Sequence, residues 1–208
     1  MTQWKSLLEE QNPARFATDI LPWVVEAGGP YFEVLFGGTE EAQLAIGQWA
    51  ARESSEVSLR RVTLLLESDI VAGGFIGMGG MELARCRKAD LIAVMGEGEG
   101  EPAARSTLMA RMGALRGLFA PIEPDQFYLS KMGVARSRQG AGLGHVIIRA
   151  FLDAGRAARY RRFALDVWAG NERATALYVS EGFRVVREST CGIPGMVYRT
   201  MVQDLEAR

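Results

Sequence analysis

The stretch Val134–Phe151, VARSRQGAGLGHVIIRAF, carries three glycines at alternate positions, Gly140, Gly142 and Gly144, between an apolar segment and a predicted helix. A Gly-rich turn before a helix gathers backbone N–H groups, and the helix dipole favours negative charge at that end. Glycine also lets the backbone approach an anion without a Cβ in the way. The stretch therefore predicts an anion-binding turn, and phosphate is the expected ligand.

Two common phosphate-binding motifs do not fit this turn. A P-loop has Lys followed by Ser or Thr after its last glycine, and no such pair follows Gly144. A dinucleotide-binding loop reads G-x-G-x-x-G with an acidic residue about 20 residues further on. Here the glycines are spaced G-x-G-x-G, and Asp166 lies later than that motif requires. Because an ordinary structural turn is the remaining alternative, the turn alone does not identify a ligand.

A second segment, Asn171–Phe183, NERATALYVSEGF, supplies the missing context. RQGAGLG resembles the Q/R-x-x-G-x-G/A signature of the GNAT superfamily of acyl-CoA-dependent N-acyltransferases. The second segment is similar to that family's pattern N-x-x-A-x-x-x-Y-x-x-x-G-F. The resemblance covers about residues 127–203, whereas the N-terminal half matches loosely and its first strand is not located. The positions that match the two patterns are Gln139, Gly142, Gly144, Asn171, Ala174, Tyr178, Gly182 and Phe183.

Apolar periodicity, turn residues and caps predict the order of elements. Strands are expected at 62–67, 70–80, 126–135, 162–169, 183–189 and 196–202. Helices are expected at 20–27, 31–36, 40–52 with Thr39 as N-cap, 82–95, 144–160 and 171–182, and residues 96–102 form an acidic joint. A further helix is expected before Pro121 and Pro124, which end it. One face of this helix is formed by Leu108, Met112, Leu115 and Phe119. That face either packs in the core or forms a wall of an acceptor pocket.

The resemblance implies an α+β fold of one domain over residues 1–208. It is a three-layer αβα sandwich whose central mixed, mostly antiparallel sheet is splayed between its fourth and fifth strands. Residues 1–126 form N-terminal helices, a hairpin and a helical insertion at 81–124, and 127–203 form the acyl-CoA-binding core. The insertion is expected to cover the acceptor site or to build a homodimer contact.

The resemblance also implies where acetyl-CoA, the co-substrate, is held. Backbone N–H groups of Gln139 to Gly144 bind its pyrophosphate, and the strand before them pairs with the pantetheine arm next to a bulge near Val134. Arg136, Arg138 and Arg173 either meet the remaining phosphate or are ordinary solvated arginines. The implied cofactor-binding residues are Met132, Gly133, Val134, Arg138, Gln139, Gly140, Ala141, Gly142, Leu143, Gly144, Asn171, Ala174 and Tyr178.

By the same resemblance, Tyr178 is the expected catalytic residue, protonating the leaving thiolate, while the Val134 N–H stabilises the oxyanion. The alternative is a core tyrosine that only hydrogen-bonds the coenzyme. Cys191 as an acyl-carrying nucleophile is a weaker alternative, and His145 is expected to open its helix or to contact phosphate. The general base is not assigned; a water chain or one of Asp125, Tyr128, Ser130, Asp166 and Glu82 is the candidate.

The expected function is an N-acetyltransferase that transfers an acetyl group directly to a primary amine of a small molecule, amino acid or peptide. A non-catalytic acyl-CoA-binding or regulatory module on the same fold is the alternative. A nucleotide-binding oxidoreductase is disfavoured because its glycine pattern is missing. With two cysteines and one histidine, the chain has neither a disulfide framework nor a metal motif, so no metal is expected.

Charge is unevenly distributed along the chain. Residues 1–126 hold 11 Lys and Arg against 18 Asp and Glu, and residues 127–208 hold 13 against 7. This asymmetry disfavours a general nucleic-acid binder and favours an anionic ligand on the basic side and a cationic acceptor on the acidic side. Residues 1–13 lack a signal-peptide pattern, and no apolar segment has the length of a membrane span. A cytoplasmic protein without a membrane partner is expected.

Overall fold

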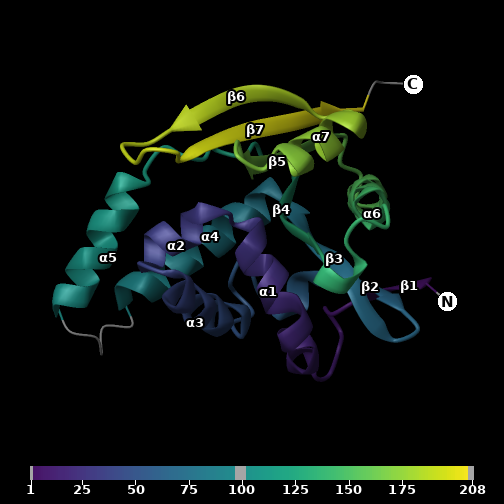
Figure 1. Cartoon of the computed structure of the whole chain (residues 1–208), viewed down its shortest axis with the longest axis horizontal. Coiled ribbons are helices and arrows are strands. Elements are labelled where there is room, and N and C mark those ends of the chain that lie inside the picture. Colours follow the sequence, from purple (N-terminus) through teal and green to yellow (C-terminus); the bar gives the residue numbers. More distant parts are fainter. Residues whose placement is uncertain (1, 97–101, 206–208) are drawn as a thin grey trace.

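The computed structural model describes residues 2–96 and 102–205 and centres on a seven-stranded sheet, ordered β1-β2-β3-β4-β5-β7-β6 (Figure 1). All neighbouring pairs are antiparallel except β4 with β5, which is parallel. The sheet is therefore mixed and mostly antiparallel, as predicted. The strands are β1 (Thr2–Ser6), β2 (Val62–Glu67), β3 (Ile70–Gly79), β4 (Gln126–Val134), β5 (Arg162–Trp168), β6 (Arg184–Thr190) and β7 (Val197–Asp204).

Helices cover both faces of the sheet, which confirms the three-layer αβα architecture (Figure 1). They are α1 (Ala17–Ala27), α2 (Pro30–Phe36), α3 (Thr39–Ala50), α4 (Gly80–Gly96), α5 (Pro102–Ala114), α6 (Leu143–Ala157) and α7 (Glu172–Ser180). The short 3-10 segments of the described ranges are η1 (Pro13–Phe16), η2 (Leu59–Arg61) and η3 (Arg136–Arg138). None of the helices in the described ranges is long and apolar enough to cross a membrane.

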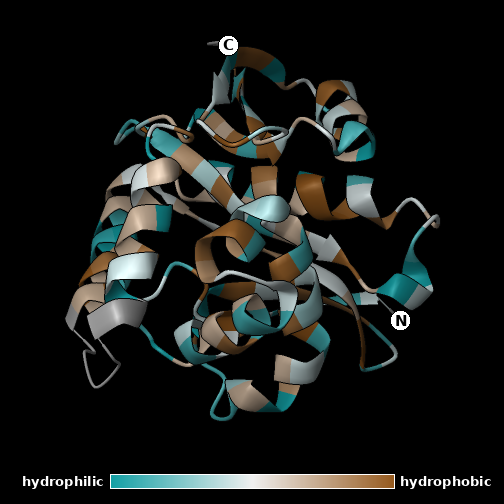
Figure 2. Cartoon of the chain, turned by 60° about the vertical axis from the view of Figure 1, so that its left-hand side comes forward, coloured by the Kyte–Doolittle hydropathy of each residue, from teal (hydrophilic) through white to brown (hydrophobic). Residues whose placement is uncertain are grey.

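Strand alternation divides the core into two layers. On β4, Tyr128 packs with α1 and α3 on one face, whereas Phe127 and Leu129 pack with α6 on the other. Figure 2 shows hydrophobic segments concentrated in the sheet and in the helices packed against it. This burial on both faces explains why β3 and β4 are largely apolar.

The splay between β4 and β5 is confirmed. The two strands pair only from Gln126 opposite Arg162 to Leu129 opposite Leu165. Opposite β3, Ile76 pairs with Lys131 and Gly77 with Leu129, so Ser130 is an extra residue on β4. The bulge therefore lies at Ser130, and the expectation of a bulge near Val134 is wrong. A bulge bends its strand and strengthens its twist, and β4 stops pairing with β5 at this residue.

The structure differs from the sequence-based expectations at three places. The edge strand β1 was not predicted, because its side chains are mostly exposed and it shows no buried alternation. Helix α5 ends at Ala114, before Pro121, and Gly117 follows in the left-handed region at φ +83°. Gly38, not Thr39, is the N-cap of α3, and the Thr39 hydroxyl donates to Glu33 instead. The predicted acidic joint at 96–102 falls largely outside the described residues.

Candidate active site

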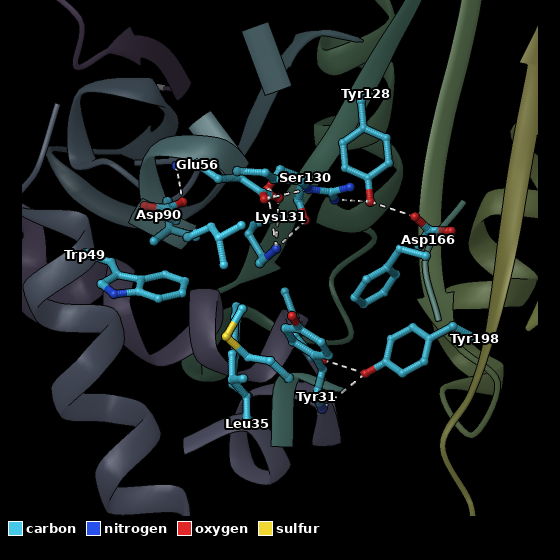
Figure 3. A pocket seen from close by; sticks show the side chains of 18 of the residues that line it. Tyr31, Leu35, Trp49, Glu56, Asp90, Tyr128, Ser130, Lys131, Asp166 and Tyr198 are labelled. Atoms are coloured by element: carbon cyan, nitrogen blue, oxygen red, sulfur yellow. Dashed lines mark hydrogen bonds and ion pairs between the residues drawn. The ribbon is translucent and has the colours of Figure 1, made fainter. Parts of the chain in front are cut away.

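A cavity of about 280 Å³ lies beside the splay (Figure 3). Ser130 and Lys131, the first β4 residues beyond the paired segment, line it, and so does Asp166, the first such residue on β5. The cavity is therefore open to the region where the two strands separate. Its other walls come from α1 to α5, the loop before β2, the segment after α5, the paired part of β4, and β7: Ala27, Gly28, Tyr31, Phe32, Leu35, Trp49, Glu56, Val57, Arg87, Asp90, Leu91, Val94, Met112, Phe119, Tyr128 and Tyr198.

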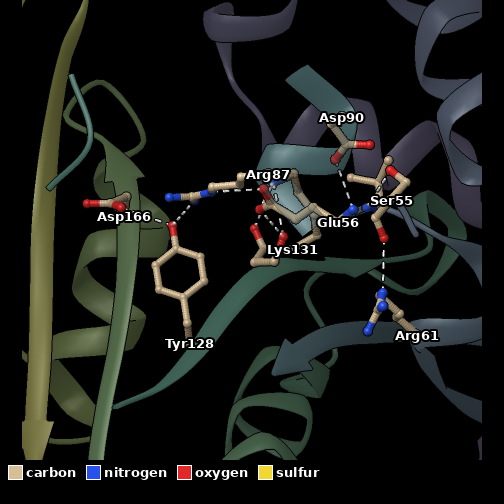
Figure 4. A network of polar contacts seen from close by, with 10 residues as sticks. Ser55, Glu56, Arg61, Arg87, Asp90, Tyr128, Lys131 and Asp166 are labelled. Atoms are coloured by element: carbon tan, nitrogen blue, oxygen red, sulfur yellow. Dashed lines mark hydrogen bonds and ion pairs between the residues drawn. The ribbon is translucent and has the colours of Figure 1, made fainter. Parts of the chain in front are cut away.

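A buried ion network forms one wall of the cavity (Figure 4). Glu56, from the loop before β2, accepts a hydrogen bond from Arg87 Nε of α4 at 2.9 Å. Its other oxygen accepts from the Ser130 hydroxyl at 2.6 Å and lies 3.6 Å from Lys131 Nζ. Three distant parts of the chain thus meet through one carboxylate.

The network determines the charge of its members. Burial by itself raises the pKa of Glu56, but the charges of Arg87 and Lys131 outweigh burial and lower that pKa from 4.5 to about 2. Burial lowers the pKa of Lys131, and the carboxylate of Glu56 partly restores it. Glu56 is therefore ionised throughout the working pH range, and its charge holds the two cations in place.

Replacing Glu56 with Gln is expected to lower the free energy of unfolding by about 3 kcal/mol at neutral pH, because two buried cations lose their counter-charge. Since folding lowers the pKa of Glu56, this stabilisation is fully present above the unfolded pKa of 4.5 and is lost as the pH falls toward 2. Urea denaturation of both proteins across this pH range measures the effect.

Asp125→Asn is the matched control for that measurement. It breaks the exposed Asp125–Arg162 ion pair, whose closest atoms are 2.9 Å apart, so a much smaller change is expected. Equal losses in Glu56→Gln and Asp125→Asn at neutral pH contradict a stabilising role of the buried network.

A second hydrogen-bond chain reaches the splay from the same network. Arg87 Nη2 donates to the Tyr128 hydroxyl at 3.3 Å, and this hydroxyl donates to Asp166 Oδ2 at 2.9 Å. The Thr200 hydroxyl donates to Asp166 Oδ1 at 2.5 Å. Burial raises the pKa of Asp166 above its ordinary value and raises the pKa of Tyr128 well above 10.0. Asp166 is thus a carboxylate with increased proton affinity at the edge of the cavity.

The structure separates the sequence-predicted general bases into two groups. Tyr128, Ser130 and Asp166 line the cavity. Asp125 and Glu82 do not line it and form ion pairs with Arg162 and Arg61.

Sequence reasoning missed the charged residues Glu56, Arg87, Asp90 and Lys131 of the cavity wall. Lys131 carried a usable signal, because a lysine inside the largely apolar strand β4 requires a buried partner. Glu56 carried none, since it lies in a polar loop. Met112 and Phe119 also line the cavity, while Leu115 of the same predicted face is buried in the core, so that face is divided between the cavity and the core.

Tyr178 lies on α7 and packs in the core layer on the α6 side of the sheet. Its ring meets Phe183 edge-on at 6.0 Å between centroids, and within the described chain its hydroxyl has no hydrogen-bond partner. Burial raises the pKa of Tyr178 from 10.0 to about 12. The phenol is therefore protonated at any working pH.

The glycine turn contains two glycines in the left-handed backbone region. Gly140 and Gly142 have φ of +85° and +76°, and a Cβ at either would meet nothing within 4 Å. Glycine is thus required there by the left-handed backbone and not by crowding. Within the described chain, the amides of Gly140, Ala141 and Gly142 donate no hydrogen bond to the backbone, and Leu143 and Gly144 lie in the first turn of α6, where amides have no partner within the helix. Anion binding here stays a prediction.

The predicted arm-binding strand has one open edge. Met132, Gly133 and Val134 pair with Phe75, Gly74 and Gly73 of β3, and no β5 residue pairs with them. The next amide, that of Ala135, donates to Ala72 of β3. Because amides alternate in direction along a strand, the Val134 amide points toward the open side.

The remaining predicted residues have other contacts. Asn171 is the N-cap of α7, its side chain accepting from the Ala174 amide at 3.0 Å. Arg138 pairs with Glu67 at 3.5 Å, and His145 Nδ1 lies 2.7 Å from Glu181 of the α7 C-cap. Arg136 and Arg173 are exposed, and Cys191 packs with the Leu115 cluster outside the cavity lining.

Residues 78–183 match the model of the acetyltransferase (GNAT) family, a range that spans β4, the glycine turn and α7. The chain belongs to this family. Its match includes both segments on which the resemblance was based. No curated protein sequence matches this acetyltransferase family member significantly.

Solved structures share the fold of this GNAT protein. An N-acetyltransferase from Staphylococcus aureus Mu50 is 15% identical with a TM-score of 0.66, covering 96% of this chain and 99% of that one. A structure described as an acetyltransferase is 18% identical with a TM-score of 0.61, covering 98% and 100%. The ribosomal-protein-S18-alanine N-acetyltransferase from Escherichia coli is 14% identical with a TM-score of 0.54, covering 100% and 96%. At these identities the likeness shows the fold alone.

Proposed function

We propose that this GNAT protein transfers an acetyl group from acetyl-CoA directly to a primary amine bound in the cavity. One observation carries the proposal. The open edge of β4 at Met132 to Val134 follows Ser130 and Lys131 of the cavity lining on the same strand, and all of them lie where β4 no longer pairs with β5. A donor arm along that edge and an acceptor in that cavity would therefore meet where β4 and β5 separate.

The donor half of the site uses backbone groups. The pantetheine arm pairs its amides with the open edge of Met132, Gly133 and Val134, as an added strand does. The amides of Gln139 to Gly144 and the N-terminus of α6 bind the pyrophosphate. The excess of basic residues over residues 127–208, 13 against 7 acidic ones, favours this anionic co-substrate.

The chemistry requires two proton transfers. The neutral amine attacks the thioester carbonyl carbon to form the C–N bond, and the Val134 amide stabilises the oxyanion. As the C–S bond breaks, Tyr178 donates its proton to the leaving sulfur and is later reprotonated from solvent. The products are the acetylated amine and free coenzyme A.

The second proton leaves the amine through the Tyr128–Asp166 pair. The Tyr128 oxygen accepts the amine proton while the Tyr128 hydroxyl proton passes to Asp166 Oδ2, 2.9 Å away. Asp166 then returns the proton to solvent. Burial favours this step, since the raised pKa of Asp166 increases its proton affinity.

A thermal-shift measurement with acetyl-CoA, coenzyme A and NAD tests the donor site. A ligand at about 100 times its Kd stabilises the native state by about 2.7 kcal/mol, so the two coenzyme A species are expected to raise Tm and NAD is not. Gly142→Val, which forces a β-branched residue into a left-handed backbone, is expected to weaken the shift. Gly113→Ala, an open helical position, is the matched control.

Released thiol measured against a panel of primary amines tests the transfer itself. The acetyltransferase proposal expects turnover with at least one amine. Coenzyme A binding without turnover of any amine favours the non-catalytic acyl-CoA-binding module, and stabilisation by NAD alone contradicts both.

A further inference from the structure

The cavity has a carboxylate at each end. Asp90 of α4 lies toward the end where Trp49 of α3 also lies, and Asp166 lies toward the other end, at the splay (Figure 3). Figure 4 shows the same two carboxylates on opposite sides of Arg87. An acceptor whose reacting nitrogen lies beside Tyr128 and Asp166 therefore extends toward Asp90.

One chain of hydrogen bonds along the cavity wall joins the two ends. The Glu56 amide donates to Asp90 Oδ2, and the Glu56 carboxylate accepts from Arg87 Nε. Arg87 Nη2 in turn donates to the Tyr128 hydroxyl, which donates to Asp166 Oδ2. The two aspartates are thus the first and last groups of this chain, and the body of an acceptor that spans the cavity passes along it.

Neither aspartate has a cation as its hydrogen-bond partner. Asp90 is only 6% exposed and accepts from the Glu56 amide at 2.9 Å and from the Ser55 hydroxyl. The hydrogen bonds to Asp166 come from hydroxyl groups as well. All of these donors are neutral, so they solvate the two carboxylates without cancelling their charges.

The electrostatics of the two aspartates agree with this arrangement. Burial raises the pKa of both carboxylates and outweighs the opposing charges of Arg52 on Asp90 and of Arg87 on Asp166. The protein therefore supplies less positive charge to each carboxylate than its burial requires. A ligand cation placed against either one completes that counter-charge.

The middle of the cavity wall has the opposite character. Glu56, the third carboxylate of the lining, accepts from Arg87 Nε at 2.9 Å and lies 3.6 Å from Lys131 Nζ. Two cations thus share one carboxylate there, and they repel a further cation at short range. An uncharged carbon chain suits this middle part, whereas positive charge suits the two ends.

The Trp49 ring adds a second feature that favours a cation at the Asp90 end. Within the described ranges, the cations of the lining lie over the Phe32, Phe119 and Tyr128 rings and not over Trp49. Trp is the side chain whose ring binds a cation best, and the interaction strengthens when the cation is desolvated. A carboxylate and an aromatic ring without a protein cation are therefore available at the same end of the cavity.

From these features we infer that the acceptor is a primary amine with a second cationic group at its far end, in the simplest case an aliphatic diamine. The reacting nitrogen lies at Tyr128 and Asp166, and the second ammonium lies at Asp90 and the Trp49 ring. This inference rests on the proposed acetyl transfer and names its substrate class. The acidic excess over residues 1–126, 18 acidic against 11 basic residues, favours the approach of such a dication.

Substrates of matched length test the inference. Heptylamine has the length of hexamethylenediamine but ends in a methyl group instead of an ammonium, and ε-aminocaproate ends in a carboxylate. In steady-state thiol-release assays, kcat/KM is expected to be about 10- to 100-fold higher for the diamine than for heptylamine, the range of a hydrogen bond to a charged group. It is expected to be lower still for ε-aminocaproate, because its carboxylate meets Asp90.

Shorter pairs cover the spacing between the two carboxylates. Tetramethylenediamine is compared with pentylamine, and pentamethylenediamine with hexylamine, in the same assay. The inference expects the diamine to be preferred in at least one of the pairs. Equal values or a preference for the monoamine in every pair, or a preference for ε-aminocaproate over the diamines, overturn it.

Asp90→Asn tests the placement of the second ammonium. The new amide oxygen still accepts from the Glu56 N–H but carries no charge, so the ratio of kcat/KM for the preferred diamine over its monoamine is expected to fall about tenfold or more. Asp153→Asn, an exposed position on α6 outside the lining, is the matched control and is expected to keep the ratio. An unchanged ratio in Asp90→Asn overturns the placement.

Trp49→Leu tests the same end of the cavity without altering a hydrogen bond of the network. Leucine keeps an apolar side chain but removes the ring, so the same ratio is expected to fall about threefold or more. If Asp90→Asn does not fold, an unchanged ratio in Trp49→Leu overturns the placement.

A binding measurement separates this inference from the proposed function. Calorimetric titration of each diamine and its monoamine into the coenzyme A-loaded protein measures acceptor affinity without turnover. Tighter binding of a diamine that is lost in Asp90→Asn supports the substrate class even if no acetyl transfer occurs, in which case only the proposed function fails. Equal or weaker binding of the diamine in every pair overturns the substrate class whatever the activity.

Discussion

Tyr178→Phe is expected to lower kcat for acetyl transfer by roughly 100-fold or more while leaving acetyl-CoA binding nearly unchanged. The substitution removes only the hydroxyl and keeps the ring that packs on Phe183. Burial raises the pKa of Tyr178 to about 12, so the wild-type phenol carries its proton throughout the assay range. Without that proton the sulfur must leave as a bare thiolate.

The measurement combines single-turnover thiol release with a coenzyme A thermal shift. Tyr160→Phe, a tyrosine packed on Phe127 away from the cavity lining, is the control and is expected to keep wild-type kcat. Because deprotonation of Tyr178 requires a pH near 12, kcat is not expected to fall from this cause at lower pH. Wild-type kcat in Tyr178→Phe contradicts its role as general acid and leaves it a core residue.

Asp166→Asn is expected to lower kcat/KM by roughly 100- to 10,000-fold at neutral pH, since an amide cannot accept the amine proton passed through Tyr128. In the wild type, activity is expected to fall as the pH drops through the raised pKa of Asp166, because a protonated Asp166 cannot act as a base. The Asp166→Asn variant is expected to lack this fall in activity at acid pH. Its residual rate is expected to rise with pH as solvent deprotonates the amine. Full pH–rate profiles of both proteins measure these differences.

Thr200→Val is expected to shift the pH–rate profile, a result that a purely structural role of Asp166 does not predict. The Thr200 hydroxyl stabilises the ionised carboxylate, so its loss raises the pKa of Asp166 further and moves the acid limb to higher pH. An Asp166→Asn variant with the wild-type rate and profile contradicts the relay and favours a water chain as the base.

Local features of the C-terminal half were predictable because each depends on residues close in sequence. The left-handed Gly140 and Gly142, the Asn171 cap of α7 and the left-handed Gly182 after that helix all follow from local backbone requirements. The strand and helix order from β4 to β7 follows from apolar periodicity in the same way.

The first half was less predictable because its elements are defined by distant partners. Strand β1 exists only through its pairing with β2, more than 50 residues away. Its exposed side chains leave no buried alternation from which to predict it. Likewise, Tyr128, Ser130 and Asp166 could not be separated from Asp125 and Glu82 until the sheet register was known.

The sequence by itself determined the family resemblance, the glycine turn, the element order of the acyl-CoA-binding core and the position of Tyr178. Only the tertiary structure decided the bulge at Ser130, the cavity and the network that joins Glu56, Arg87 and Lys131. The physical reason is the separation along the chain of the residues that interact. Turns, caps and periodicity are properties of neighbouring residues, whereas a buried ion network forms only when packing brings a loop, a helix and a strand to one point.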